Sequence, residues 1–167
     1  MNSTTDAVDR EALRQAMRQW TTGVTVVSSV SAETRHGMAV SSFTSNSLEP
    51  PLVLISLAHS SRTFSLVQRS GVFGVTVLRQ GQQEISDRFA GRTPDDQDRF
   101  VGLDTFTLET GAPFLVDGLA FFDCRVTATV PVSDHTLFIG QVVSVQTRPD
   151  GAPLVYYGRE YRQLARE

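Results

Sequence analysis

The 167-residue sequence contains no lysine, since all 15 of its basic residues are arginine. This absence excludes Schiff-base chemistry on a lysine and the lysine of a phosphate-binding P-loop. Any bound phosphate must therefore be held by arginine, hydroxyl groups or backbone N–H groups. Biased codon usage would also explain the missing lysine, but the exclusion holds in either case.

Cysteine is almost absent as well, because Cys124 stands alone. A single cysteine can form neither an internal disulfide nor a zinc site of paired cysteines. No apolar run approaches about 18 residues, and no basic segment followed by an apolar one opens the chain. A cytoplasmic location without a membrane span is therefore expected. The net charge of −3 gives no sign of nucleic-acid or anionic-membrane binding.

Several motifs of common cofactor and metal sites are missing, including G-x-G-x-x-G and H-E-x-x-H. His36, His59 and His135 lie far apart in the sequence and match no ligand spacing, so no metal site is expected. Ser41 and Ser42 stand outside any G-x-S-x-G turn, which argues against a serine hydrolase.

Length and composition indicate one domain over residues 1–167, because 40% hydrophobic residues supply a core of ordinary size. Helical spacing of apolar residues predicts a helix over 8–20 with one apolar face. Residues 60–71 and 82–91 are predicted to form two further helices, each ended by a glycine.

Strand signals dominate the rest of the chain. Residues 33–37 read as a hairpin connection, 51–58 as a fully buried strand, and 92–119 as irregular. The predicted strands are 21–30, 51–58, 72–78, 120–130, 136–147 and 153–158. Because no regular helices separate them, the pattern disfavours a parallel doubly wound sheet. It predicts a mainly β fold, an antiparallel barrel with peripheral helices.

The stretch "HGMAVSSFTSNSLEPP" is unusually rich in small and hydroxyl side chains and carries one acidic residue, Glu49. As extended chain, residues 37–45 would let a flat ligand approach the backbone, whose N–H and C=O groups could bind its polar edge. A heteroaromatic ring with polar edges would suit this wall. The alternative is a strand that packs closely against another backbone, for example at a dimer contact.

Two further segments suggest binding groups. "HSSRT" (59–63) places hydroxyls and a guanidinium at a predicted helix N-terminus, which favours a phosphate; the alternative is an ordinary capped helix. In "SDHTLFIGQV" (133–142), Asp134 could orient His135 at the mouth of a strand; the alternative is a histidine that caps a turn.

These segments resemble the short flavin reductases, which have an FMN-binding split barrel and serve two-component flavin-dependent monooxygenases. The resemblance covers roughly residues 10 to 164, and its matching blocks run in order along the chain. They are "RQWTTGVTVVSS", "HGMAVSSFTSNSLEPPLVLISL", "SRTF", "FGVTVL", "RFAG", "SDHTLFIGQVVSV" and "PLVYYGREYRQL".

The resemblance implies an antiparallel, Greek-key split β-barrel and a homodimer. It also implies a reaction in which NADH or NADPH reduces FMN or FAD for a partner monooxygenase. The residues that it places at the flavin are Ala39, Val40, Ser41, Ser42, Phe43, Ser45 and Asn46, with Ser60, Ser61, Arg62 and Arg92 on the phosphate side. Those on the nicotinamide side are His135, the catalytic candidate, and Gly158, Arg159, Glu160 and Tyr161.

Two positions depart from the family pattern. Ser133 stands where many members have glycine, and Ser41 stands where many have asparagine, differences that bear on turn geometry and flavin preference. Two other functions fit the same pattern: a non-catalytic flavin carrier or sensor, and a flavin-dependent oxidase with its own small substrate.

Overall fold

The computed structural model describes residues 8–92, 98–148 and 150–165. Its helices are α1 (Arg10–Met17), α2 (Arg62–Ser70) and α3 (Gln83–Asp87), and a π-helical turn, η1 (Arg88–Arg92), follows α3. The strands are β1 (Thr22–Gly23), β2 (Thr25–Ser31), β3 (Thr34–Val40), β4 (Thr44–Leu48), β5 (Pro51–Ala58), β6 (Val72–Val77), β7 (Thr105–Thr107), β8 (Pro113–Leu115), β9 (Ala120–Val132), β10 (His135–Thr147), β11 (Val155–Tyr157) and β12 (Glu160–Arg162).

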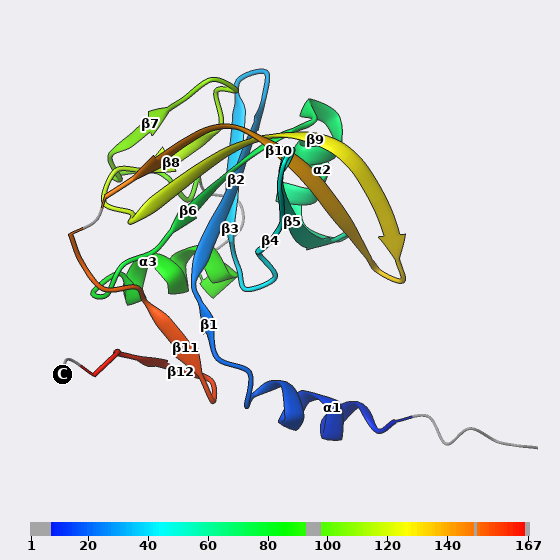
Figure 1. The fold of residues 1–167 in the computed structure, drawn as a ribbon, viewed down its shortest axis with the longest axis vertical. Coiled ribbons are helices and arrows are strands. Elements are labelled where there is room, and N and C mark those ends of the chain that lie inside the picture. Colours follow the sequence, from blue (N-terminus) through cyan, green and yellow to red (C-terminus); the bar gives the residue numbers. More distant parts are fainter. Residues whose placement is uncertain (1–7, 93–97, 149, 166–167) are drawn as a thin grey trace, which may run out of the picture.

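Seven strands form one antiparallel sheet in the order β3-β2-β6-β9-β10-β5-β4, which confirms the mainly β prediction. The long, bent β9–β10 hairpin connects the two halves of this sheet, and α2 packs against β2 and β3 (Figure 1). The β7–β8 pair and the three-stranded β1-β11-β12 sheet lie beside it. The curved sheet with helices at its margin is the split-barrel architecture expected from the sequence.

The core is divided between the two faces of β2. Val27 belongs to one cluster with Phe73 and Phe138, while its neighbour Val26 belongs to another with Phe89. Because successive side chains of a strand point to opposite faces, both sides of β2 are buried.

Three local predictions were wrong. The hairpin connection expected at residues 33–37 is largely strand, because β3 begins at Thr34. Strand β5 alternates between buried and half-buried positions and is not fully buried. Residues 92–119, predicted to be irregular, contain the β7–β8 pair, and the Phe106 ring of β7 packs against Phe121 of β9.

Candidate functional site

The small-residue stretch forms two strands separated by a bend at residues 41–43. Three hollows meet at this bend, with volumes of about 210, 550 and 480 Å³, and each is lined by both Ser41 and Thr22. Ser41 is exposed. The hollows share Ser41 and Thr22, and together the three hollows are called the groove at Ser41.

Strand β3 is at the end of the sheet order and has β2 as its one neighbour among the described strands. Backbone groups on the outer edge of such a strand are not used by a second strand. Gly37 does not belong to this open part. A Cβ at Gly37 would lie 2.9 Å from Phe89 and 3.0 Å from Phe100, so protein side chains already fill the space that its small size provides.

Ser42 and Phe43 have structural partners. The Ser42 hydroxyl donates to the Ser56 carbonyl (3.1 Å) and accepts from the Ser56 N–H (2.9 Å), which joins the bend to β5. The Phe43 ring lies 5.1 Å from that of Phe122, against the core. Both residues nevertheless line the 550 Å³ hollow beside Ser41.

The smallest hollow lies between two walls. Ala39, Val40 and Ser41 form one, and Ser86, Asp87 and Ala90 of α3 and η1 form the other. Tyr156 and Tyr161 complete it, with their ring centroids 5.5 Å apart in an edge-to-face arrangement. Of this set, sequence reasoning missed Thr22, Tyr156 and the residues of α3, because no local pattern places them opposite Ser41.

The turn between β11 and β12 lies at the third hollow, which Gly158 and Arg159 line together with side chains of α1. Both residues have positive φ angles, 61° and 70°, and Arg159 adopts this conformation at a conformational cost that glycine would avoid. Glu160 lines none of the three hollows and forms an ion pair with Arg162 (2.7 Å).

The predicted phosphate segment begins α2. Ser61 is its N-cap: the hydroxyl accepts from the Phe64 N–H (3.1 Å) and donates to the Ala58 carbonyl (2.9 Å). The side chains of Ser60 and Arg62 are exposed beside it. The Ser61 hydroxyl thus serves the helix, while its two neighbours face solvent.

His135 is held by Asp134, as the sequence suggested. Its Nδ1 lies 2.8 Å from an Asp134 carboxylate oxygen, and this hydrogen bond holds the pKa of Asp134 below its usual range. The backbone N–H of His59 donates to the Asp134 carbonyl, which brings the hairpin to the start of α2. Ser133 has a φ of 53°, the left-handed region that favours glycine.

The candidate residues therefore form two groups. One group surrounds Ser41 and lines the three hollows. The other group lies at the start of α2 and includes His135. Ser45 and Asn46 are exposed on β4 and line none of the three hollows. The side chain of Arg92 lies outside the described part of the structure.

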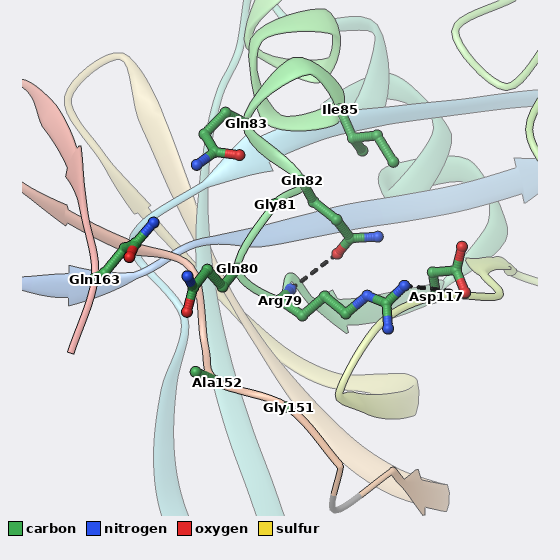
Figure 2. A pocket seen from close by; sticks show the side chains of 10 residues that line it. All are labelled: Arg79, Gln80, Gly81, Gln82, Gln83, Ile85, Asp117, Gly151, Ala152 and Gln163. Atoms are coloured by element: carbon green, nitrogen blue, oxygen red, sulfur yellow. Dashed lines mark hydrogen bonds and ion pairs between the residues drawn. The ribbon is translucent and has the colours of Figure 1, made fainter. Parts of the chain in front are cut away.

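A hollow of about 570 Å³ lies away from all these residues (Figure 2). The backbone N–H of Arg79 donates to Gln82 there, and the Arg79 guanidinium pairs with Asp117 at 3.6 Å. No predicted site residue lines it. Despite its size it lacks the small-residue wall, so the groove at Ser41 is the better candidate.

Neither a metal site nor a reactive thiol is found among the described residues. No three histidine, cysteine or acidic side chains among them lie close enough together to hold a metal ion. Burial, with a smaller effect of Asp123, raises the pKa of Cys124 to about 12, so its thiol stays protonated at neutral pH. Within the same part of the chain, no helix has the length and apolar character needed to span a membrane.

Comparison with known proteins gives matches along nearly the whole chain. Residues 17–165 match the family described as Flavin reductase like domain. The chain is 41% identical over 157 residues to the NADH-dependent flavin reductase StyB of Pseudomonas fluorescens. The aligned region covers 92% of this chain and 89% of that protein. It is 36% identical over 155 residues to the reductase component of 4-hydroxyphenylacetate 3-monooxygenase of Thermus thermophilus, with coverage of 93% and 97%. The NADH:FAD oxidoreductase SgcE6 of Streptomyces globisporus superposes with a TM-score of 0.90 and 32% identity, covering 99% of each chain.

Proposed function

The chain belongs to the flavin reductase-like family, and we propose that it works as such a reductase in the groove at Ser41. It is an NAD(P)H-dependent flavin reductase that uses FMN or FAD as the acceptor. The observation that carries this conclusion is the family match over residues 17–165, together with 41% identity to an NADH-dependent flavin reductase. The reduced flavin supplies a partner monooxygenase, in line with the Thermus thermophilus relative.

The bound flavin and nicotinamide supply the chemistry, a hydride passed from nicotinamide C4 to flavin N5. The protein has to bring the two rings into contact at the correct angle and keep water away. No strong general base is required for this transfer. An edge strand with small side chains fits such a task, because a planar ring can lie against it and meet backbone donors and acceptors.

We assign the ring to the wall formed by Ala39, Val40 and Ser41. Ser42 shapes this wall through its hydrogen bonds to β5, and Phe43 through its packing. The exposed Ser45 and Asn46 extend the same surface along β4.

Ser60, Arg62 and Arg92 are proposed to hold the flavin phosphate, with Ser61 keeping the first turn of α2 in place. Hydroxyl, guanidinium and backbone N–H groups are the donors left to a protein without lysine. His135, oriented by Asp134, and the turn from Gly158 to Tyr161 are proposed to position the nicotinamide half.

A homodimer is proposed from α1. The helix contributes no buried residue, and its Leu13 and Met17 are 56% and 57% exposed, while Trp20, beyond the end of the helix, is 69% exposed. Figure 1 shows α1 projecting from the body of the molecule. An eight-residue helix is marginal by itself in water, so a partner surface must support it, and a second copy is the simplest one. The single domain over 1–167 and the cytoplasmic location stay predictions.

Anaerobic mixing of the protein, excess flavin and NADH tests the function. We expect the visible flavin absorbance to disappear over many turnovers, at about 1–1,000 per second. NADPH and both flavins, run in parallel, give the preferences. A carrier or sensor would bind flavin without reducing it. An oxidase would leave the flavin oxidised until its own substrate was added.

A further inference from the structure

Asp87 lies in the ring groove on the side opposite the small-residue wall. It lines the hollow of about 210 Å³ whose other side is formed by Ala39, Val40 and Ser41. Among the described residues that line the three hollows meeting at Ser41, Asp87 is the one with a carboxylate side chain. A ring bound in this hollow would lie close to that carboxylate, because the hollow is small.

Tyr161 fixes the position of this carboxylate. Its phenol donates to Asp87 Oδ1 at 2.6 Å, and the phenol oxygen lies 2.9 Å from the Ser86 hydroxyl. The Tyr161 ring is itself supported edge-to-face by Tyr156. The half-buried carboxylate is therefore held in the groove and does not turn freely into solvent.

The hydride brings two electrons and one proton to the flavin ring, so NAD(P)⁺ leaves and the ring gains a negative charge. The oxidised ring is neutral, whereas reduced flavin is an anion in mildly alkaline solution. Two like charges close together in a partly buried site repel each other more strongly than they would in water. A fixed carboxylate in the groove therefore discriminates between the substrate and product forms of the same ring.

We infer that Asp87, positioned by Tyr161, weakens the binding of reduced flavin relative to oxidised flavin and so favours release of the product. This inference rests on the proposed function, because it requires the ring to bind at Ser41. It assigns to Asp87 an electrostatic effect on flavin release, and to Tyr161 the role of a positioning residue. The hydride transfer itself needs neither side chain as an acid or base.

The test compares the affinities for oxidised and reduced flavin, measured anaerobically in mildly alkaline buffer, in the parent and in Asp87→Asn. Asparagine keeps an oxygen that can accept from Tyr161 and removes the charge. We expect the dissociation constant of oxidised flavin to change by less than about twofold and that of reduced flavin to fall by about tenfold. For a two-electron couple, this ratio corresponds to a rise of about 30 mV in the reduction potential of bound flavin.

Two further variants separate charge from packing. Tyr161→Phe removes the hydrogen bond that positions the carboxylate and keeps its charge, so the affinity for reduced flavin should rise by less than it does in Asp87→Asn. Glu84→Gln removes an exposed carboxylate of the same helix outside the groove, and should leave both affinities unchanged. If Asp87→Asn is poorly folded, Asp87→Ser removes the charge in a smaller side chain.

The possible results separate a failure of the role inferred for Asp87 from a failure of the proposed reductase function. An unchanged affinity ratio in Asp87→Asn, in a protein whose parent reduces flavin with NADH, would overturn the inference and leave the function intact. An equal shift in Tyr161→Phe would also overturn it, because packing would then be the cause. A parent protein that neither binds nor reduces flavin would contradict both the role of Asp87 and the proposed reductase function.

Discussion

Ser41 and Ser42 are adjacent in the sequence but have different surroundings. The Ser42 hydroxyl makes two hydrogen bonds to the backbone of Ser56, so changing it would disturb the junction with β5. Ser41 is exposed and lines all three hollows of the groove. A substitution at Ser41 therefore tests ligand binding with less risk to the fold than one at Ser42.

We predict that Ser41→Trp fills the groove and weakens flavin binding by about tenfold or more, equivalent to about 1.4 kcal/mol. Because Ser41 is exposed, the melting temperature should stay within a few degrees of the parent value, about the effect of a surface substitution. Flavin titration by fluorescence and thermal unfolding measure the two effects. Thr107→Trp, an exposed change on β7, is the control. Tight flavin binding by Ser41→Trp would show that the ring does not lie on this wall.

The composition of residues 37–45 suggested a ring wall, because small uncharged side chains on extended chain let a flat ligand approach the backbone, but it suited a strand packed against another backbone equally. The opposite side could not be predicted in this way. Asp87 and Tyr156 line the same hollow as Ser41 only after η1 has packed against β3 and β11 has paired with β1. At Gly37 the prediction of an open, ligand-facing backbone was wrong, because Phe89 and Phe100 fill the space beside this glycine.

At the scale of elements, the segment at Asp98–Phe100 attaches η1 to the wall strand. The buried Arg99 donates to the Gly37 carbonyl (3.1 Å) and to the Phe89 carbonyl (3.0 Å). Asp98 pairs with Arg35 of β3 at 2.8 Å. Burial alone would raise the pKa of Asp98, but the Phe100 N–H and the Arg35 guanidinium outweigh it and lower the pKa.

This pKa shift predicts a pH dependence of stability. A lowered pKa in the folded state stabilises the fold above the unfolded pKa of about 3.9, and the gain disappears as the pH falls through the lower folded value. We expect Asp98→Asn to lose about 0.5–1 kcal/mol at neutral pH, since both side chains are partly exposed. Urea unfolding from neutral to strongly acidic pH measures the difference from the parent, which should vanish in acid. A difference independent of pH would contradict the ionic origin, and Glu109→Gln controls for loss of an exposed charge.

The elements themselves were largely predictable. Helix α2 ends at Gly71, its left-handed C-cap, as the sequence indicated, and Ser61 is its N-cap. Strand β9 was harder, because both sides of its first half are covered. Its second cover is the β7–β8 pair, which falls in residues that the sequence pattern left as irregular.

At the scale of the whole molecule, α1 is the helix that has no buried residue among the three α-helices described. The segment after it is anchored, because the Arg18 carbonyl accepts from the Gly158 N–H and Gln19 accepts from the Tyr157 phenol. The helix itself extends beyond this anchor with its apolar face exposed. The 3.6-residue period predicted that face correctly, but a periodic pattern cannot say whether the covering surface belongs to the same chain.

We predict that Leu13→Glu dissociates a homodimer. Burying a leucine is worth about 1.5–3 kcal/mol, and a symmetric dimer contains two copies, so the dissociation constant should rise by about 100-fold to 10,000-fold. Gln15→Glu adds the same side chain to the opposite face of α1 and should leave the assembly unchanged, which separates the apolar contact from an effect of charge.

Sedimentation velocity over a range of protein concentrations measures both variants and the parent. A parent that sediments as a monomer at every concentration, or a Leu13→Glu variant that sediments as the parent dimer does, would contradict the assignment of α1 to a second copy. If dissociation also weakens flavin binding, the groove depends on the partner, because α1 side chains line the hollow that contains Arg159.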